Sequence, residues 1–454
     1  MNFVPEQWWE KSSGVIRFKC KEEGITIRDV ISKLDDVKSW GFDVVEIFAP
    51  YHGGNEYAGL DVIDYFRVDP AIGAMDEFLE LINCAHKKGI AVIIFINLGY
   101  CAMHYPPFIK ACEDVRRGID SPETHLFLWS NTGEDIFDKS LAPYFMNDLD
   151  GSWHFNKKAG KYYWVKWRGI SGDAALPQFN FGSSIWRKKC KQIIRFWMEI
   201  GIDGMIIDAV NWYMNCNWEI NYQTITEVIH RYPNKYIQPE GAGGFNDDPV
   251  QWILRGKYNS VQDYGINIWW ENRDVIGKAI DTGDPCFIEE ALQSYRDRVV
   301  AAGGVTYIGP YWNKKVSREQ RRLEIATLVT IGEFFHDDGK LLKLNWPQGD
   351  ILIIKRLMKA LQAHPALQAS GNRHRLLTND DHKFYAFTRT SKDGKERMLV
   401  ILNFQNETQE VVVQLHSPTF LRDIFSNEKI RNILELQVIL PPYGYRIYEI
   451  TQEA

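Results

Sequence analysis

The chain has 454 residues, of which 45% are hydrophobic and 25% are charged, with a formal net charge of −6. A chain of this length is expected to divide into two or three domains, and the composition is that of a globular protein. The acidic balance argues against a general nucleic-acid-binding protein, which usually carries a basic surplus. Aromatic residues make up 13% of the chain and include 16 Trp, a surplus that suits either core packing or stacking against sugar rings.

The N-terminal segment and the cysteines predict a location for the chain. The start, MNFVPEQWWEKSSG, lacks the basic and then apolar segments of a signal peptide. No run approaches the roughly 18 apolar residues that a membrane span requires. The seven cysteines are odd in number and show no CxxC spacing. We therefore expect reduced thiols in a cytoplasmic protein, with neither a disulfide framework nor a zinc site.

From about residue 25 to 365, strand-like apolar runs alternate with amphipathic helix-like segments. Helices are expected over 27–40, 75–89 and 186–201. Strands are expected in GFDVVEIFAP, IAVIIFIN, IDGMIID, KYIQPE, NSVQDYG, PCFIEEA, GVTYIG and IGEFF. Near-continuous apolar strands suit a parallel sheet that is buried on both faces. About eight such units predict a (β/α)8 TIM barrel rather than an open doubly wound sheet.

Two stretches depart from this alternation. Residues 101–178 are rich in Trp, Tyr, Asp and Gly, and so long an interruption of a compact domain is usually functional or a small inserted domain. After about residue 370, short alternating strands and turns predict an antiparallel β domain. The expected domains are a catalytic barrel over 1–100 and 179–370, an inserted B domain over 101–178 and a C-terminal β-sandwich over 371–454.

Two acids end consecutive predicted strands. Asp208 closes IDGMIID and Glu240 closes KYIQPE, and parallel barrels carry their catalytic residues at such strand ends. Glycoside cleavage needs one ionised carboxylate to attack the anomeric carbon and one protonated carboxyl group to donate to the leaving oxygen. The alternative is that each acid caps a helix or forms a salt bridge at a strand–helix junction.

Longer segments around these acids carry the pattern of a known enzyme family. DGMIIDAV resembles the nucleophile strand, YIQPEG the acid/base strand, LPQFNF the end of the inserted B domain and LVILNFQNETQEVVV the C-terminal domain of the α-amylase superfamily, glycoside hydrolase family 13. The resemblance implies that Asp208 is the nucleophile and Glu240 the acid/base, and it gives Asp61 the place of an acid that holds the non-reducing sugar end. SPETHLFLW ahead of GKYYWVKW is most similar to the oligo-1,6-glucosidase and trehalose-synthase branch.

The chain departs from the family pattern at five positions around the cleaved sugar. Ile206 replaces an Arg that keeps the nucleophile ionised, and Phe95 replaces an Asp at the end of the third strand. Tyr100 stands at the His of an Asn-His pair, and Leu60 replaces an aromatic platform. By chain order, Trp312 replaces the third catalytic acid. Losing one such contact typically costs a factor of about 10² to 10³ in rate.

Other side chains are candidate substitutes for the lost contacts. Asp337, in His336-Asp337-Asp338, is one candidate for the third acid, although this segment aligns better with the end of the eighth strand. The Trp269-Trp270 pair is another candidate for contact with the sugar. For His104 a purely structural role is the alternative. The predicted substrate-binding residues are Asp61, Tyr100, His104, Asn211, Trp212, Tyr311, Trp312 and Asp337.

Together these patterns predict a retaining α-glycosidase that acts on small α-linked oligosaccharides or glycosides without a cofactor. Its two carboxyl groups should lie roughly 5–5.5 Å apart. Neither nucleic acid nor a membrane is expected as a partner, and the oligomeric state is not predicted. Transglycosylation or isomerisation through the same intermediate is a close alternative. A catalytically silent homologue that binds a carbohydrate or a protein is the alternative from another class.

Overall fold

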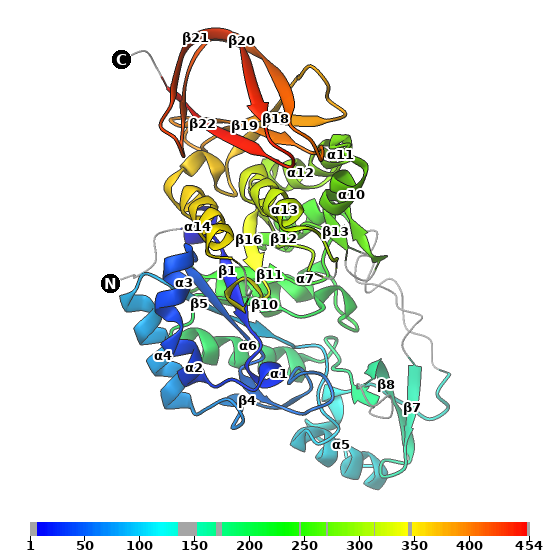
Figure 1. Ribbon diagram of the computed structural model, residues 1–454. Coiled ribbons are helices and arrows are strands. Elements are labelled where there is room, and N and C mark those ends of the chain that lie inside the picture. The colour runs from blue at the N-terminus through cyan, green and yellow to red at the C-terminus, as the bar shows by residue number, and fades with distance from the viewer. Residues whose placement is uncertain are drawn as a thin grey trace. The chain divides into compact units, whose positions relative to one another are not determined.

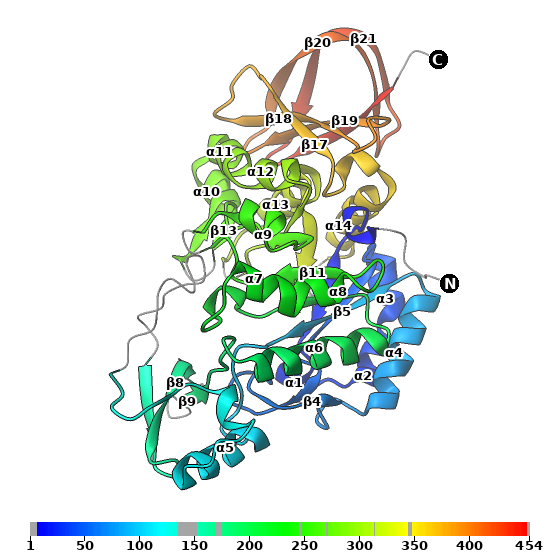
Figure 2. The ribbon, with the colours of Figure 1, turned by 180° about the vertical axis from the view of Figure 1, so that it is seen from behind.

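The computed structural model describes residues 7–134, 152–168, 175–244, 247–268, 271–312, 314–343 and 347–451 (Figures 1 and 2). The chain forms two compact units. The first unit consists mainly of residues 45–259 together with 17–35, and the second of residues 260–454 together with 7–16 and 36–44.

Eight parallel strands form the barrel sheet. They pair in the order β11-β10-β5-β2-β1-β16-β15-β12, and nearly every residue in them is buried, as expected for strands covered on both faces. Asn259 is the residue before β12, and its backbone N–H donates to the carbonyl of Ile237 in β11. The strands are β1 (Val15–Phe18), β2 (Val44–Phe48), β5 (Ala91–Ile96), β10 (Gly204–Ile207), β11 (Tyr236–Pro239), β12 (Ser260–Gln262), β15 (Val305–Ile308) and β16 (Phe334–Asp337).

Helices follow the strands and turn apolar faces toward the sheet. In α4, Phe78, Leu81, Ile82 and Ala85 are buried at helical spacing, and α4 packs beside α2 (Figure 1). Helices α6 and α8 also pack together (Figure 2). The main helices are α2 (Ile27–Ser32), α3 (Leu34–Trp40), α4 (Met75–Lys87), α6 (Ser184–Glu199), α8 (Glu227–Ile229), α9 (Pro249–Leu254), α10 (Val275–Thr282), α11 (Cys286–Ser294), α12 (Arg296–Ala301), α13 (Arg318–Ile331) and α14 (Gln348–Ala363).

The (β/α)8 prediction is confirmed, and two of its local expectations were wrong. The helix expected over 27–40 is interrupted at Lys33, between α2 and α3. PCFIEEA is not a strand but the start of α11, which buries Ile288, Ala291 and Leu292 at helical spacing. A seven-residue apolar segment is too short for periodicity to separate the two structures. Strand β1 was not predicted at all, because Arg17 interrupts its apolar residues, VIRF.

The insertion after β5 is a small domain of its own, as predicted. Helix α5 (Pro106–Arg117) precedes an antiparallel sheet in which β8 (Lys161–Arg168) pairs with β6 (Trp129–Ser130), β7 (Ser152–Asn156) and β9 (Ala175–Pro177). Aromatic side chains from the helix and the sheet pack together, with the rings of Phe108 and Tyr163 5.0 Å apart.

The C-terminal segment is antiparallel, again as predicted. Its strands form one six-stranded sheet in the order β17-β18-β19-β22-β20-β21. Leu399, Ile401, Val411 and Val413 belong to the apolar cluster that this sheet buries. The boundaries given for the three domains stay predictions. The strands are β17 (Asn372–Leu376), β18 (Phe384–Thr390), β19 (Arg397–Asn403), β20 (Gln409–Asp423), β21 (Lys429–Leu440) and β22 (Tyr445–Thr451).

Within the described ranges, no helix combines the length and the apolar character needed to cross a membrane.

Candidate active site

The register of two strands places the two predicted catalytic acids next to each other. Ile207 of β10 is paired with Pro239 of β11, so Asp208 and Glu240 occupy the next positions on strands that run about 4.8 Å apart. The N–H of Glu240 donates to the carbonyl of Ile207 at 2.8 Å, and the N–H of Asp208 donates to Ile96 of β5, also at 2.8 Å. Three consecutive strands therefore hold the two acids in place.

A left-handed turn follows β10 at Ala209, where φ is 44° and ψ is 43°. A residue with a Cβ atom adopts this conformation at a cost on the order of 1–3 kcal/mol. The turn directs the N–H of Ala209 to Oε2 of Glu240, at 3.0 Å. The strained backbone thus supplies a hydrogen-bond donor to one carboxyl group from the residue next to the other.

Burial dominates the protonation of both acids. Burial raises the pKa of Asp208 well above its ordinary value, and the charge of Glu240 raises it further. Burial also raises the pKa of Glu240, against the N–H of Ala209 and the positive charge of Arg17. Two buried carboxyl groups on neighbouring strands titrate as a coupled pair, because the charge of one disfavours ionisation of the other.

The groups that favour a negative charge are unevenly divided between the two acids. Glu240 has the Ala209 N–H and Arg17, whereas Asp208 has the hydroxyl of Tyr100, which donates to its carboxylate and lowers its pKa. Oδ2 of Asp208 is buried and has no hydrogen-bond partner among the described residues. The protein therefore stabilises a charge on Glu240 at least as well as one on Asp208.

An apolar pair stands where the family pattern has an Arg and an Asp. Ile206 of β10 lies directly opposite Phe95 of β5, and both are almost fully buried. Replacing both members of a buried ion pair by apolar residues is often neutral or stabilising. The two departures noted in the sequence are thus one coupled change between neighbouring strands.

A guanidinium group reaches this region from β1 instead. Nε of Arg17 lies 2.7 Å from Oε1 of Glu46, which is fully buried in β2. Cζ of Arg17 lies 5.2 Å from the ring centre of Phe95 and 5.6 Å from that of Phe48. Arg17 thus packs against the residue that replaced the family Asp, and its charge acts on Glu240 rather than on Asp208.

Four aromatic side chains gather beside the acids. The ring of Tyr100 lies 6.2 Å from that of Tyr57 and 6.1 Å from that of Trp167. Trp167 in turn lies 6.0 Å from Trp212. Burial and the nearby charges of Asp208 and Glu240 raise the pKa of Tyr57. We call Tyr57, Tyr100, Trp167 and Trp212 the aromatic cluster; such rings suit the apolar faces of a sugar.

A lysine adjoins the aromatic cluster. Nζ of Lys166 lies 3.6 Å from the ring centre of Trp212, within cation–π range. Burial lowers the pKa of Lys166 to about 8.

The other predicted site residues of the first unit have different surroundings. Asp61 accepts hydrogen bonds from the N–H groups of Glu56 and Tyr57, at 3.3 and 3.1 Å, so its carboxylate faces its own loop. Asn211 is buried and donates to the carbonyl of Gly241 at 3.2 Å. His104 is exposed and makes no contact with either acid among the interactions of the described residues.

Three predicted site residues belong to the second unit. Tyr311 and Trp312 follow β15, the seventh barrel strand, whereas Asp337 ends β16, the eighth. Burial raises the pKa of Asp337 to about 7, against the hydrogen bond from the Leu341 N–H. The His336-Asp337-Asp338 segment lies at the end of the eighth strand and not after the seventh.

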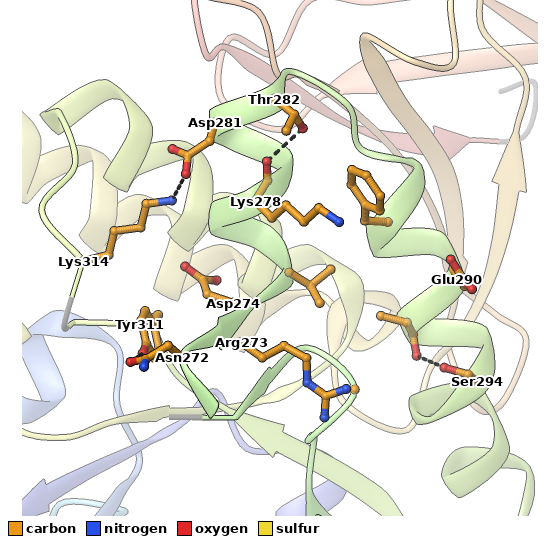
Figure 3. A pocket seen from close by; sticks show the side chains of 14 residues that line it. Asn272, Arg273, Asp274, Lys278, Asp281, Thr282, Glu290, Ser294, Tyr311 and Lys314 are labelled. Atoms are coloured by element: carbon orange, nitrogen blue, oxygen red, sulfur yellow. Dashed lines mark hydrogen bonds and ion pairs between the residues drawn. The ribbon is translucent and has the colours of Figure 1, made fainter. Parts of the chain in front are cut away.

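Tyr311 lines a cavity of about 860 Å³ in the second unit, where its hydroxyl donates to Asn272 at 3.4 Å (Figure 3). Asp274, Lys278 and Asp281 also line the cavity. Acidic and basic side chains both line the cavity, so its charge does not indicate one class of ligand. The Trp269-Trp270 pair lies outside the described residues.

Sequence reasoning missed Arg17, Tyr57, Lys166 and Trp167. Tyr57 left a signal, since an aromatic side chain was expected beside Asp61 and Leu60 did not supply it. The other three come from a strand of four residues and from the inserted domain, and nothing in their spacing connects them to Asp208.

Two family profiles match the chain. One, described as "Alpha amylase, catalytic domain", matches residues 19–253, which is more than half of the chain. The other, described as "Maltogenic Amylase, C-terminal domain", matches residues 374–447.

Similar proteins of known activity share part of the sequence. Trehalose synthase/amylase TreS of Mycobacterium tuberculosis is 27% identical over 184 residues, which are 40% of this chain and 29% of that protein. Trehalose-6-phosphate hydrolase of Bacillus subtilis is 26% identical over 212 residues, 45% of this chain and 36% of that protein. Oligo-1,6-glucosidase of Parageobacillus thermoglucosidasius is 25% identical over 193 residues, which are 41% of this chain and 31% of that protein. Each match spans about a third of the relative's length.

Solved structures share the whole fold. Trehalose-6-phosphate hydrolase of Bacillus licheniformis has a TM-score of 0.74 at 17% identity, covering 98% of this chain and 100% of that one. Trehalulose synthase MutB of Pseudomonas mesoacidophila has a TM-score of 0.73 at 15% identity, covering 98% and 99%. At such identities the likeness shows the fold alone.

The Arg17–Glu46 pair is expected to matter for stability. Arg17→Gln removes the guanidinium group that pairs with the buried carboxylate of Glu46 and should lower the free energy of unfolding by about 3–5 kcal/mol. Arg28→Gln breaks an ion pair whose arginine is 65% exposed and should cost less than about 1 kcal/mol. Urea unfolding followed by Trp fluorescence compares the two. Equal losses would contradict the burial argument, whereas partial recovery in Arg17→Gln/Glu46→Gln would support it.

Proposed function

Because the chain belongs to the α-amylase family, glycoside hydrolase family 13, we propose that it is a retaining α-glycoside hydrolase acting on small α-linked oligosaccharides or glycosides. The observation that carries this proposal is the in-register pair of buried carboxyl groups, Asp208 and Glu240, beside the aromatic cluster. Adjacent strands about 4.8 Å apart suit the short carboxyl separation of retaining enzymes.

In the first step, the ionised carboxylate of Asp208 attacks the anomeric carbon. The bond from that carbon to the leaving oxygen breaks, and Glu240 donates its proton to this oxygen. In the second step, Glu240 takes a proton from water. The water oxygen attacks the same carbon and releases Asp208.

This mechanism requires a proton to lie on Glu240 and the charge to lie on Asp208. The Ala209 N–H and Arg17 favour the opposite arrangement, and the Tyr100 hydroxyl opposes them. A substrate shifts the balance, because its leaving oxygen accepts a hydrogen bond from protonated Glu240 and its anomeric carbon becomes positive in the transition state. The substrate therefore largely brings about the protonation state that the mechanism needs, with the proton on Glu240 and the charge on Asp208.

The relatives support a small substrate with an α-linkage. They are named as a trehalose synthase/amylase, a trehalose-6-phosphate hydrolase and an oligo-1,6-glucosidase. We propose a disaccharide or short glycoside, with the aromatic cluster covering one face of the sugar. A cytoplasmic location is part of the proposal and is supported by the seven cysteines, all within described ranges and all free thiols.

Two further functions have specific support. A sugar hydroxyl that replaces water in the second step gives transglycosylation or isomerisation, the activity in the name of trehalulose synthase MutB. A catalytically silent carbohydrate-binding homologue is favoured by the loss of the arginine at Ile206 and by the donors gathered on Glu240.

Trapping the intermediate tests the proposal. An activated α-glycosyl fluoride that accumulates the glycosyl-enzyme should label the peptide containing Asp208, as detected by mass spectrometry. Asp208→Asn should abolish labelling and lower kcat by about 10⁴-fold or more. The control is Asp64→Asn, which changes an acid on β4 (Val62–Val68) and should keep both the labelling and the kcat of the wild type. No label and no turnover across a broad panel of α-glycosides would establish the silent homologue instead.

Tyr100 is expected to set the acid limit of activity. Tyr100→Phe removes a donor that favours the charged form of Asp208, so the pKa of Asp208 rises. Since Asp208 must be ionised, the acid limb of the kcat/KM profile should move to higher pH, with a fall of about 10²-fold in kcat. The matched control is Tyr105→Phe, because the Tyr105 hydroxyl is buried without a hydrogen bond to any described residue. An unshifted limb in Tyr100→Phe would remove Tyr100 from this role.

A further inference from the structure

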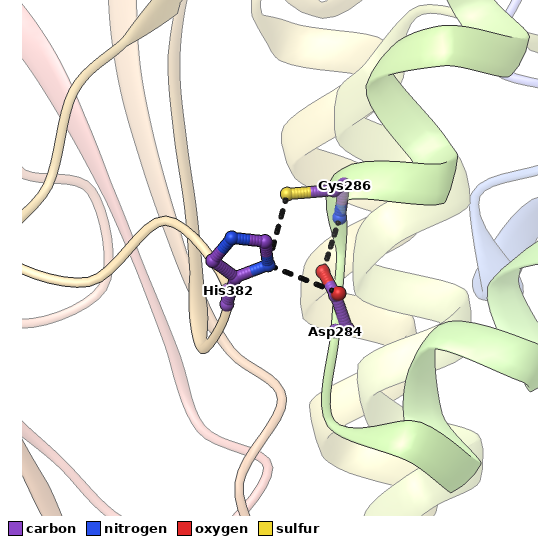
Figure 4. A group of neighbouring side chains, drawn as sticks. All are labelled: Asp284, Cys286 and His382. Carbon is purple, nitrogen blue, oxygen red and sulfur yellow. Dashed lines mark hydrogen bonds and ion pairs between the residues drawn. The ribbon is translucent and has the colours of Figure 1, made fainter.

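Three donor atoms of different chemistry converge in the second unit, on residues that the proposed hydrolysis does not use (Figure 4). Asp284 and Cys286 lie at the start of α11, and His382 lies in the loop between β17 and β18. Nδ1 of His382 is 3.7 Å from Sγ of Cys286 and 3.1 Å from Oδ2 of Asp284. All three donor atoms lie within 4.8 Å of one another.

These separations fit the ligands of a tetrahedral zinc ion. Bonds of about 2.3 Å to sulfur and about 2.0–2.1 Å to nitrogen and oxygen place ligand atoms roughly 3.6 Å apart for sulfur and nitrogen and roughly 3.3 Å for nitrogen and oxygen. The observed 3.7 and 3.1 Å differ from these values by only a few tenths of an ångström. The same imidazole nitrogen faces both other donors, as it would toward one shared ion.

We propose that Asp284, Cys286 and His382 form a binding site for a divalent transition-metal ion, with zinc as the ion that the donor set fits best. A thiolate and an imidazole select zinc and its neighbours over magnesium and calcium, which prefer oxygen ligands throughout. Three protein ligands leave a fourth position for water. The carbonyl of Asp381, 3.4 Å from the sulfur, lies beside this position.

The chain holds the carboxylate and the thiol in place on one side. Oδ1 of Asp284 accepts the N–H of Cys286 at 3.0 Å, which leaves Oδ2 directed toward His382. Pro285 between them fixes one backbone dihedral angle. Such supporting bonds orient metal ligands before the ion arrives.

The loop that carries His382 is also held. Oδ1 of Asp381 accepts from the N–H and the hydroxyl of Thr378, at 2.9 and 2.8 Å, and from Arg375 at 3.1 Å. The loop is therefore closed by its own side chains, and the metal would add a link from this loop to α11.

Without metal the same three groups form a hydrogen-bonded cluster. Nδ1–H of His382 donates to Asp284, and the thiol of Cys286 donates to the Asp381 carbonyl. A metal ion must displace both protons, so its apparent affinity should rise with pH.

The site would join two parts of the second unit. α11 belongs to the barrel segment of the chain and His382 to the C-terminal sheet, and Gln405 of that sheet already donates to the carbonyl of Gly283 at 2.8 Å. A ligand that binds only the folded state adds its binding free energy to stability. Zinc should therefore raise the melting temperature of this unit.

Cobalt titration of the tag-free, metal-free full chain tests the proposal. We expect a thiolate-to-cobalt charge-transfer band with visible d–d bands, saturating at about one ion per chain and displaced by zinc. Cys286→Ser and His382→Ala should lose the charge-transfer band or weaken zinc binding at least about 100-fold, since even an outer partner of a metal ligand contributes 10–100-fold. The wild-type signal should weaken as the pH falls, because protons compete with the metal for its ligands.

Matched controls separate this site from adventitious binding. Cys84 is the other cysteine that is only partly buried, and His374 is exposed on β17; Cys84→Ser and His374→Ala should keep the full signal. Cys286→Ser keeps the backbone N–H that Asp284 accepts, so circular dichroism should show a folded protein. A charge-transfer band that survives in Cys286→Ser, or no band in the wild type, would overturn the proposal. So would a zinc-induced shift in melting temperature that is equal in the wild type and in Cys286→Ser.

Discussion

The register between β10 and β11 is the constraint on which the site depends. It sets Asp208 and Glu240 on neighbouring strands in a place where both are surrounded by protein. Burial raises the pKa of each, and the charge of Glu240 raises that of Asp208 further. The other features of the site act on this balance: the turn at Ala209 and Arg17 favour a charge on Glu240, and Tyr100 favours one on Asp208.

The family pattern has been altered around an unchanged pair of acids. At Ile206 and Phe95 an apolar contact has replaced two opposite charges that would face each other across β10 and β5. With apolar residues at both positions, neither strand carries a buried charge there that lacks an opposite charge. Arg17 restores a positive charge from another strand, but on the side of Glu240. An enzyme with this arrangement depends on its substrate, and on Tyr100, to bring the charge back to Asp208.

The sequence could predict the parts of the site that lie at strand ends. A buried strand that ends in an acid is visible in a single segment, and Asp208 and Glu240 were found in this way. Arg17 could not be found, because its position in β1 carries no motif and its effect depends on pairing with Glu46. The error at PCFIEEA has a similar origin, since only the packing of α11 decides its structure. His382 is nearly a hundred positions from Asp284 and Cys286, so the three share no spacing motif.

Unsatisfied acceptors indicate what the first unit is built to hold. Asp208 Oδ2, Asn211 Oδ1 and Gln178 Oε1 are buried, and no described residue donates a hydrogen bond to them. Gln178 is joined to Trp212 through its amide nitrogen, at 2.6 Å, so these acceptors border the aromatic cluster. A buried acceptor without a donor costs about 1–3 kcal/mol, and three such acceptors in this part of the first unit are hard to explain by packing. Hydroxyl groups of a sugar, or ordered water, are the donors that such a place requires. The aromatic rings beside these acceptors favour a sugar over water, because a sugar can also pack its apolar face against the rings and water cannot.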